Sequence, residues 1–165
     1  MKTTLLISLL SFFILASENK EETKVDEIQL NNACVKGLSA NIRSEADIKS
    51  SIVINLPKYT PLTILEKGEK WSKVKSKNFE GWLVNELIVD DVNCVVVVQP
   101  SNVFESPQSK TPAQSRETVE LNEGLRIIET QIGITKVQDK YGNTFWLENH
   151  NIWPKTKLEN LSLSL

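Results

Sequence analysis

The chain has 165 residues, of which 40% are hydrophobic and 24% charged, and its formal net charge is −2 at pH 7. This composition is typical of a folded globular protein and excludes an intrinsically disordered one. The nearly balanced charge argues against nucleic acid as a partner, because no strong positive field would attract it. One His and two Cys cannot form a four-ligand zinc site, so we expect neither a metal nor a cofactor.

Residues 1–17 have the features of a cleaved export signal. Lys2 provides a short basic start, and residues 5–16 form an apolar run that ends at the small residues Ala16 and Ser17. The run is shorter than the roughly 20 apolar residues of a membrane-spanning helix. We therefore predict an exported protein, periplasmic or secreted, with no membrane span after cleavage. A buried core helix is the alternative.

The chain after the signal divides into a charged segment and a region with strand patterns. Residues 18–32 contain few large apolar groups, so we expect a flexible leader there. Beyond it, short apolar runs separated by turn residues predict a small all-β fold, and no helical periodicity is present. The strands predicted in the first half are 33–36, 40–43, 52–56, 62–67, 71–76 and 81–84.

The second half of the chain repeats residues of the first half in the same order. Glu66, Lys73, Val74 and Lys77 recur as Glu129, Lys136, Val137 and Lys140, and Trp82, Leu83, Asn85 and Ile88 recur as Trp146, Leu147, Asn149 and Ile152. Such self-similarity indicates tandem domains of one fold. The strands predicted in the second half are 94–99, 103–105, 118–121, 125–130, 134–138 and 144–147.

These patterns predict two domains, at residues 33–88 and 94–153, joined by a linker at 89–93 and followed by a tail at 154–165. Units of about sixty residues bury only part of their surface and are marginal alone. We therefore expect the two domains to share an interface.

Several segments of the first domain resemble the bacterial SH3 (SH3b) family. The segments are Leu38-Ser39-Ala40-Asn41-Ile42-Arg43-Ser44, Trp71-Ser72-Lys73-Val74 and Gly81-Trp82-Leu83, in the order and spacing of that family. The resemblance covers about residues 33–88. The second copy is divergent, because Phe104 replaces Arg43, Ile134 replaces Trp71 and Phe145 replaces Gly81.

The resemblance implies two tandem small SH3-like β-barrels after a signal peptide. It also implies a non-enzymatic, exported protein that recognises cell-wall peptide or an envelope protein. Two alternatives remain open: a structural or regulatory partner of one envelope protein, and a remnant accessory module of a cell-wall peptidase. The chain contains no G-x-S-x-G, H-E-x-x-H or phosphate-binding glycine motif that would indicate an enzyme.

Aromatic residues near the predicted loop tips of the first domain are the candidate ligand-binding residues. They are Tyr59, Trp71 and Phe79, whose side chains could line a shallow groove for a peptide. The alternative is that Trp71 and Phe79 fill the barrel interior, as large side chains must in small barrels. Trp82 and Trp146 recur at one position in both halves, which favours a packing role for each.

Cys34 and Cys94 form a candidate disulfide between the first strands of the two domains. Export provides an oxidising compartment, and the count of two cysteines leaves none unpaired. The repeat pattern also places both residues at the start of their copies. Two buried free thiols are the alternative.

Overall fold

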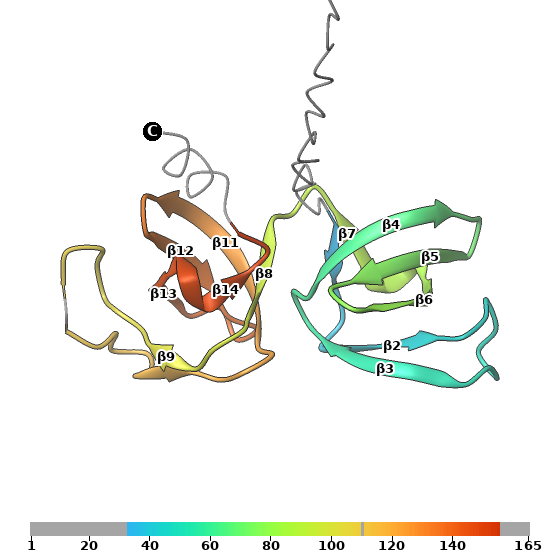
Figure 1. Cartoon of the computed structure of the whole chain (residues 1–165), viewed down its shortest axis with the longest axis horizontal. Coiled ribbons are helices and arrows are strands. Elements are labelled where there is room, and N and C mark those ends of the chain that lie inside the picture. The colour runs from blue at the N-terminus through green and yellow to red at the C-terminus, as the bar shows by residue number, and fades with distance from the viewer. Residues whose placement is uncertain (1–32, 110, 156–165) are drawn as a thin grey trace, which may run out of the picture.

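The computed structural model describes residues 33–109 and 111–155, in which the chain is all-β with two short 3₁₀ turns and no α-helix (Figure 1). The predicted signal peptide at 1–17, the leader at 18–32 and most of the predicted tail lie outside these residues. Nowhere in the described part is a helical segment long and apolar enough to span a membrane.

Residues 33–90, the N-terminal unit, form a seven-stranded antiparallel sheet with the order β3-β2-β6-β5-β4-β1-β7. The sheet curls into a partial barrel (Figure 1) around a core that includes Ile42, Leu62, Val74 and Leu83. Its elements are β1 (Ala33–Val35), β2 (Ser39–Arg43), β3 (Ile52–Pro57), β4 (Pro61–Lys67), β5 (Trp71–Ser76), β6 (Phe79–Val84), η1 (Asn85–Leu87) and β7 (Ile88–Asp90).

Strand β5 illustrates how the sequence specifies this sheet. Its side chains alternate between two faces, so that Ser72, Val74 and Ser76 are buried while Lys75 is exposed. Pro57 and Pro61 stand at the end of β3 and the start of β4, where a missing backbone donor is tolerated. Between these prolines, Tyr59 has a positive φ of 65°, which turns the chain from one strand into the next.

Residues 94–153, the C-terminal unit, contain a five-stranded sheet with the order β13-β12-β11-β8-β14 and a two-stranded ribbon. Val95, Leu125, Phe145 and Leu147 belong to its separate hydrophobic core. Its elements are β8 (Cys94–Val97), β9 (Ser101–Asn102), β10 (Thr118–Val119), β11 (Gly124–Gln131), β12 (Ile134–Gln138), β13 (Thr144–Glu148), η2 (Asn149–Asn151) and β14 (Ile152–Trp153).

The observed strands differ from the predicted ones mainly outside the long hairpins. The six strands predicted in the first half are present, but β7 also forms and extends to Asp90, inside the predicted linker at 89–93. In the second half, the strand predicted at 103–105 is absent. Phe104 instead makes isolated bridges to Trp146 and to Pro112, whose ring nitrogen cannot extend a hydrogen-bonded ladder.

The five-stranded sheet has the same strand order as part of the N-terminal sheet, β6-β5-β4-β1-β7. A polar contact under the 3₁₀ turn is also present in both units. Ser72 Oγ donates to Asn85 Oδ1 at 2.7 Å, and Thr135 Oγ1 donates to Asn149 Oδ1 at 2.7 Å. In both units the backbone N–H of this asparagine donates to a carbonyl of the hairpin turn, at 3.0 Å.

A disulfide and a close backbone contact join the two units. Cys34 and Cys94 are bonded, with a Cα–Cα distance of 6.4 Å. At the start of β11, a Cβ added to Gly124 would overlap the carbonyl oxygen of Lys58 and lie 2.9 Å from Thr60 N. Only glycine allows the turn between β3 and β4 to approach the C-terminal unit this closely.

Replacing Gly124 with alanine is expected to destabilise the protein by about 1–3 kcal/mol, because the added methyl group meets backbone that cannot move aside as a flexible side chain would. Urea unfolding of the purified protein would measure this loss. Gly37→Ala is the matched control, since the nearest atom to its Cβ is the flexible end of Leu87, at 3.0 Å. Equal stabilities of the two variants would contradict the close contact.

Candidate functional site

The structure does not bring the three predicted ligand-binding aromatics together. Trp71 pairs with Val84 at one end of the β5–β6 hairpin, and Phe79 pairs with Ser76 at the other end. The two ends are separated by about 16 Å, from a rise of roughly 3.3 Å per residue. Tyr59, half-buried, follows β3, and the pairing of Thr63 with Lys75 places it toward the Phe79 end.

Trp71 and Phe79 also lie on different faces of the sheet. Trp71 is half-buried and shares the outer face of β5 with Lys73 and Lys75, whereas Phe79 is cross-strand partner to the buried Ser76 and is 41% exposed. Neither residue belongs to the described hydrophobic core of the N-terminal unit.

The outer face of β5 and β6, which carries Trp71, also carries an ion pair. Lys73 Nζ lies 2.8 Å from Glu80 Oε1. The hydrogen bond to Glu80 and its negative charge raise the pKa of Lys73, and the same contact lowers the pKa of Glu80. Arg43, which pairs with Trp82, donates from Nη1 to the carbonyl of Ser50 at 2.6 Å and so braces the β2–β3 turn.

The two tryptophans that recur in the sequence differ in environment. Trp146 is 6% exposed, whereas Trp82 is only half-buried between Lys73 and Arg43 on neighbouring strands. In the C-terminal unit, Phe104 exchanges two backbone hydrogen bonds of 2.9 Å with Trp146. The segment that contains Phe104 therefore lies along β13 at Trp146.

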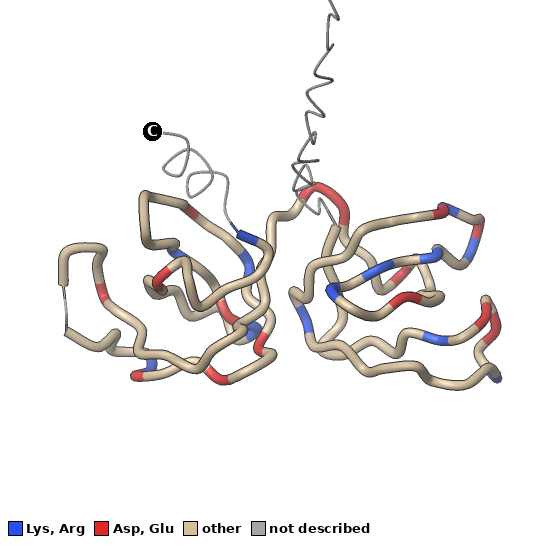
Figure 2. The backbone as a smooth tube through the Cα atoms, in the orientation of Figure 1, with Lys and Arg blue, Asp and Glu red and all other residues tan. Residues whose placement is uncertain are grey.

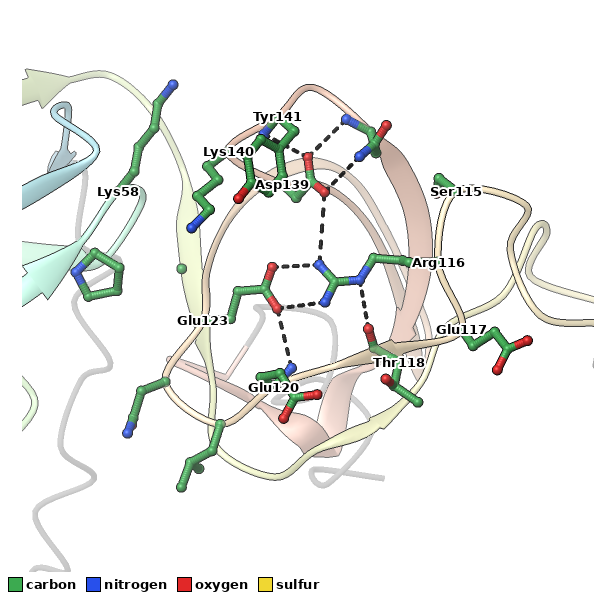
Figure 3. A pocket seen from close by; sticks show the side chains of 15 residues that line it. Lys58, Ser115, Arg116, Glu117, Thr118, Glu120, Glu123, Asp139, Lys140 and Tyr141 are labelled. Carbon is green, nitrogen blue, oxygen red and sulfur yellow. Dashed lines mark hydrogen bonds and ion pairs between the residues drawn. The ribbon is translucent and has the colours of Figure 1, made fainter.

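A hollow of about 640 Å³ lies where the two units meet (Figure 3). We call it the interdomain hollow. Pro57 and Lys58 of the N-terminal unit form one wall, and residues 115–118, 120–124, 139–141 and 143 of the C-terminal unit form the rest. Its volume falls in the range of small-ligand sites, although it is open to solvent.

A charged network links the two loops that line the hollow (Figure 3). Arg116 donates to both carboxylate oxygens of Glu123, at 2.6 and 3.0 Å, and its Nη1 lies 3.8 Å from Asp139 Oδ2. Asp139 is 2% exposed, and its Oδ1 accepts the backbone N–H groups of Tyr141 and Asn143, both at 2.9 Å. The network therefore fixes the β12–β13 turn against the segment 115–123, which contains β10.

The rim of the hollow combines apolar and charged side chains. Tyr141 and Leu121 are 77% and 54% exposed. The ammonium group of Lys140 lies 5.1 Å from the centre of the Tyr141 ring, and Glu120 lines the hollow on the side away from Lys140 in Figure 3. Among the described residues, neither Lys140 nor Glu120 has an ion pair. Both charges are thus available to a ligand.

Sequence reasoning did not find this hollow. Its residues come from both units and from loops, where no short-range pattern brings them together. One signal is present in the sequence, because Tyr141-Gly142-Asn143 lies between the predicted strands 134–138 and 144–147 and has the composition of a hairpin turn. Gly142 has the positive φ expected of such a turn, 94°.

Figure 2 shows acidic and basic residues interspersed along the backbone of both units. The chain therefore offers local charge pairs, such as those at the hollow, instead of a broad electrostatic field.

Comparisons with known proteins identify part of the chain. Residues 37–89 match the model of the bacterial SH3 domain. The comparison with curated proteins gave no match. Two solved structures are similar: NlpC2 from Trichomonas vaginalis at 12% identity, and NlpC1 from the same organism at 13%, each with a TM-score of 0.34.

The chain covers less than half of those two structures. The alignments include 74% of this chain but 47% of NlpC2 and 45% of NlpC1. The family match, in contrast, extends from Gly37 to Val89 and thus covers β2 to β6 and most of β7. Residues 37–89 of this all-β chain therefore form a bacterial SH3 domain.

Proposed function

We propose that the chain is an exported, non-enzymatic binding protein that recognises peptides of the bacterial cell wall. The observation that carries the proposal is the bacterial SH3 domain at residues 37–89. The apolar run after Lys2 supports export. The interdomain hollow supports binding of a short ligand, because it offers charges of both signs beside an exposed aromatic ring.

We further propose that the C-terminal unit is a second, divergent SH3-like unit. Its five-stranded order, β13-β12-β11-β8-β14, corresponds to β6-β5-β4-β1-β7. The hydrogen bond of Thr135 to Asn149 corresponds to that of Ser72 to Asn85. Tyr59 and Asn122, which precede β4 and β11, both have a positive φ, at 65° and 63°. Strand order, this hydrogen bond and the positive φ agree at separate places in the two units, and together they support a common fold better than residue identities alone.

A second candidate function is a rigid docking surface for one envelope protein. It is favoured by the Cys34–Cys94 bond and by the approach of Gly124 to the Lys58 carbonyl, which would hold both units in one orientation. Such a surface needs no small-ligand site.

Sedimentation with purified cell wall tests the main proposal. The chain lacking residues 1–17 is mixed with insoluble bacterial cell wall and centrifuged, and the proposal expects it in the pellet. Soluble cell-wall peptides should then release it. Retention of one envelope protein at equal stoichiometry, without any binding to cell wall, would favour the second candidate. Binding to neither would refute both.

A further inference from the structure

We propose that the interdomain hollow is the peptide site, and that it takes a short peptide bearing both a free ammonium group and free carboxylates, with Tyr141 as the apolar anchor. This inference rests on the proposed function, which it deepens by naming the site and the ligand chemistry. The interdomain hollow takes the place of Trp71 and Phe79 as the proposed binding site, because those two residues lie at opposite ends of a hairpin.

The backbone of the turn that carries Tyr141 is held in place before a ligand binds. The ring is 77% exposed, yet the backbone N–H of Tyr141 donates to the buried carboxylate of Asp139 at 2.9 Å. The second carboxylate oxygen of Asp139 accepts from Asn143 Nδ2 at 3.0 Å and faces Arg116. A turn held by a buried carboxylate loses little further freedom when a ligand binds, so an aromatic ring on it is a favourable contact surface.

The charges at the hollow specify a ligand with groups of both signs. Arg116 is neutralised by Glu123 and Asp139, so it has little remaining capacity for a ligand anion. Lys140 and Glu120 line different sides of the hollow in Figure 3. The other charged lining residues without an ion pair in the described part of the chain, Lys58 and Glu117, add one more charge of each sign. A ligand carboxylate near Lys140 and a ligand ammonium group near Glu120 would satisfy both, whereas a neutral glycan would satisfy neither.

The wall contributed by the N-terminal unit makes the hollow depend on both units. Pro57 and Lys58 line it, and the Lys58 carbonyl is held against Gly124. The Lys58 ammonium group lies 4.8 Å from the centre of the Tyr59 ring. The site is therefore complete only when the two units are docked, and neither unit by itself should bind the peptide as tightly as the intact chain does.

Titration followed by two-dimensional NMR tests the inference. The disulfide-bonded chain without residues 1–17 is titrated with the free tripeptide alanyl-glutamyl-lysine, with the uncharged tripeptide acetyl-alanyl-glutaminyl-alanine amide, and with an N-acetylglucosamine oligomer. We expect the free tripeptide to shift the amide signals of residues 115–124 and 139–143. We expect the uncharged tripeptide to bind several-fold more weakly and the sugar oligomer to leave these signals unchanged.

Two variants and a control identify the contacts. Tyr141→Ala is expected to raise the Kd of the tripeptide about tenfold or more, and Lys140→Ala by a smaller factor that shrinks at high salt. Ile132→Ala is the control, because Ile132 stands at another hairpin tip of the same unit with a matching exposure of 78% and does not line the hollow. Unchanged spectra outside the substituted turn would show that the variants fold.

The outcomes separate the inference from the proposed function. A Kd unchanged in Tyr141→Ala, or shifts centred on Trp71 and Phe79, would overturn the hollow as the site while leaving cell-wall binding intact. Equal binding of the sugar oligomer would overturn the ligand chemistry. Failure of the tripeptide to bind a chain that still sediments with cell wall would also overturn the inference alone.

Discussion

Removing the Cys34–Cys94 disulfide is expected to lower the free energy of unfolding by about 4 kcal/mol. The bond closes a loop with a sequence separation of 60 residues, and the chain-entropy model relates stabilisation to the length of such a loop. A loss of this size is a large share of the stability of a protein domain, typically about 5–15 kcal/mol.

Urea unfolding with and without reductant measures this effect. The double variant Cys34→Ala, Cys94→Ala should unfold at the lower midpoint in both conditions, which separates bond cleavage from other effects of the reductant. Two transitions in the reduced protein would show that the disulfide also maintains cooperativity between the units. Identical midpoints for oxidised and reduced wild-type protein would contradict the prediction.

Replacing Phe145 with alanine is expected to destabilise the protein by about 3–5 kcal/mol. Phe145 is 1% exposed and belongs to the core of the C-terminal unit, and the Arg116 guanidinium group lies 5.4 Å from the centre of its ring. The truncation would therefore leave a cavity and remove a cation–π contact beneath the interdomain hollow.

Thermal and urea unfolding of Phe145→Ala measure the loss. Phe79→Ala is the matched control, because it deletes the same atoms from a side chain that is 41% exposed. We expect the control to lose clearly less stability than Phe145→Ala. Comparable losses would mean that Phe145 contributes no more to packing than a partly exposed ring.

The residues Gly81 and Phe145 explain why the two units differ despite their common strand order. Gly81 faces Val74 across the sheet, and Phe145 faces Val137. A Cβ at Gly81 would overlap the Arg43 carbonyl, so the backbone of β2 comes very close to β6 where the two strands pair. In the C-terminal unit the large Phe145 side chain fills the interior, and the corresponding segment near Phe104 forms only isolated bridges.

Strands with alternating burial could be predicted from the sequence alone. The hairpins of β4, β5 and β6 and of β11, β12 and β13 follow period-two patterns with turn residues between them, which are local properties of the chain. The short strands β7 and β14 were missed because two or three residues carry no detectable period. β7 pairs with β1, and β14 pairs with β8. These pairs join segments that are far apart in the chain, so they form only when each sheet is assembled.

The cysteines show the limit of alignment by identity. Pro61 and Gly124 occupy the same place, at the start of β4 and of β11. Cys34 pairs with Pro61, but the residue that pairs with Gly124 is Val96, two positions after Cys94. The assumption that both cysteines occupy one repeat position was therefore wrong. Cys34 pairs with Val89 of β7, and β8 begins at Cys94 only four residues after β7 ends, so the two cysteines come within a Cα–Cα distance of 6.4 Å.

The sequence by itself determined the all-β class, the long hairpins, the SH3-like segments of the N-terminal unit and the presence of only two cysteines. Only the tertiary structure decided which loops meet. Trp71 and Phe79 were separated because they lie at opposite ends of the β5–β6 hairpin, whose strands are 6 residues long. Lys58, Glu120 and Tyr141 were brought to one hollow because a glycine and a disulfide allow two separate sheets to dock, a long-range effect with no local sequence pattern.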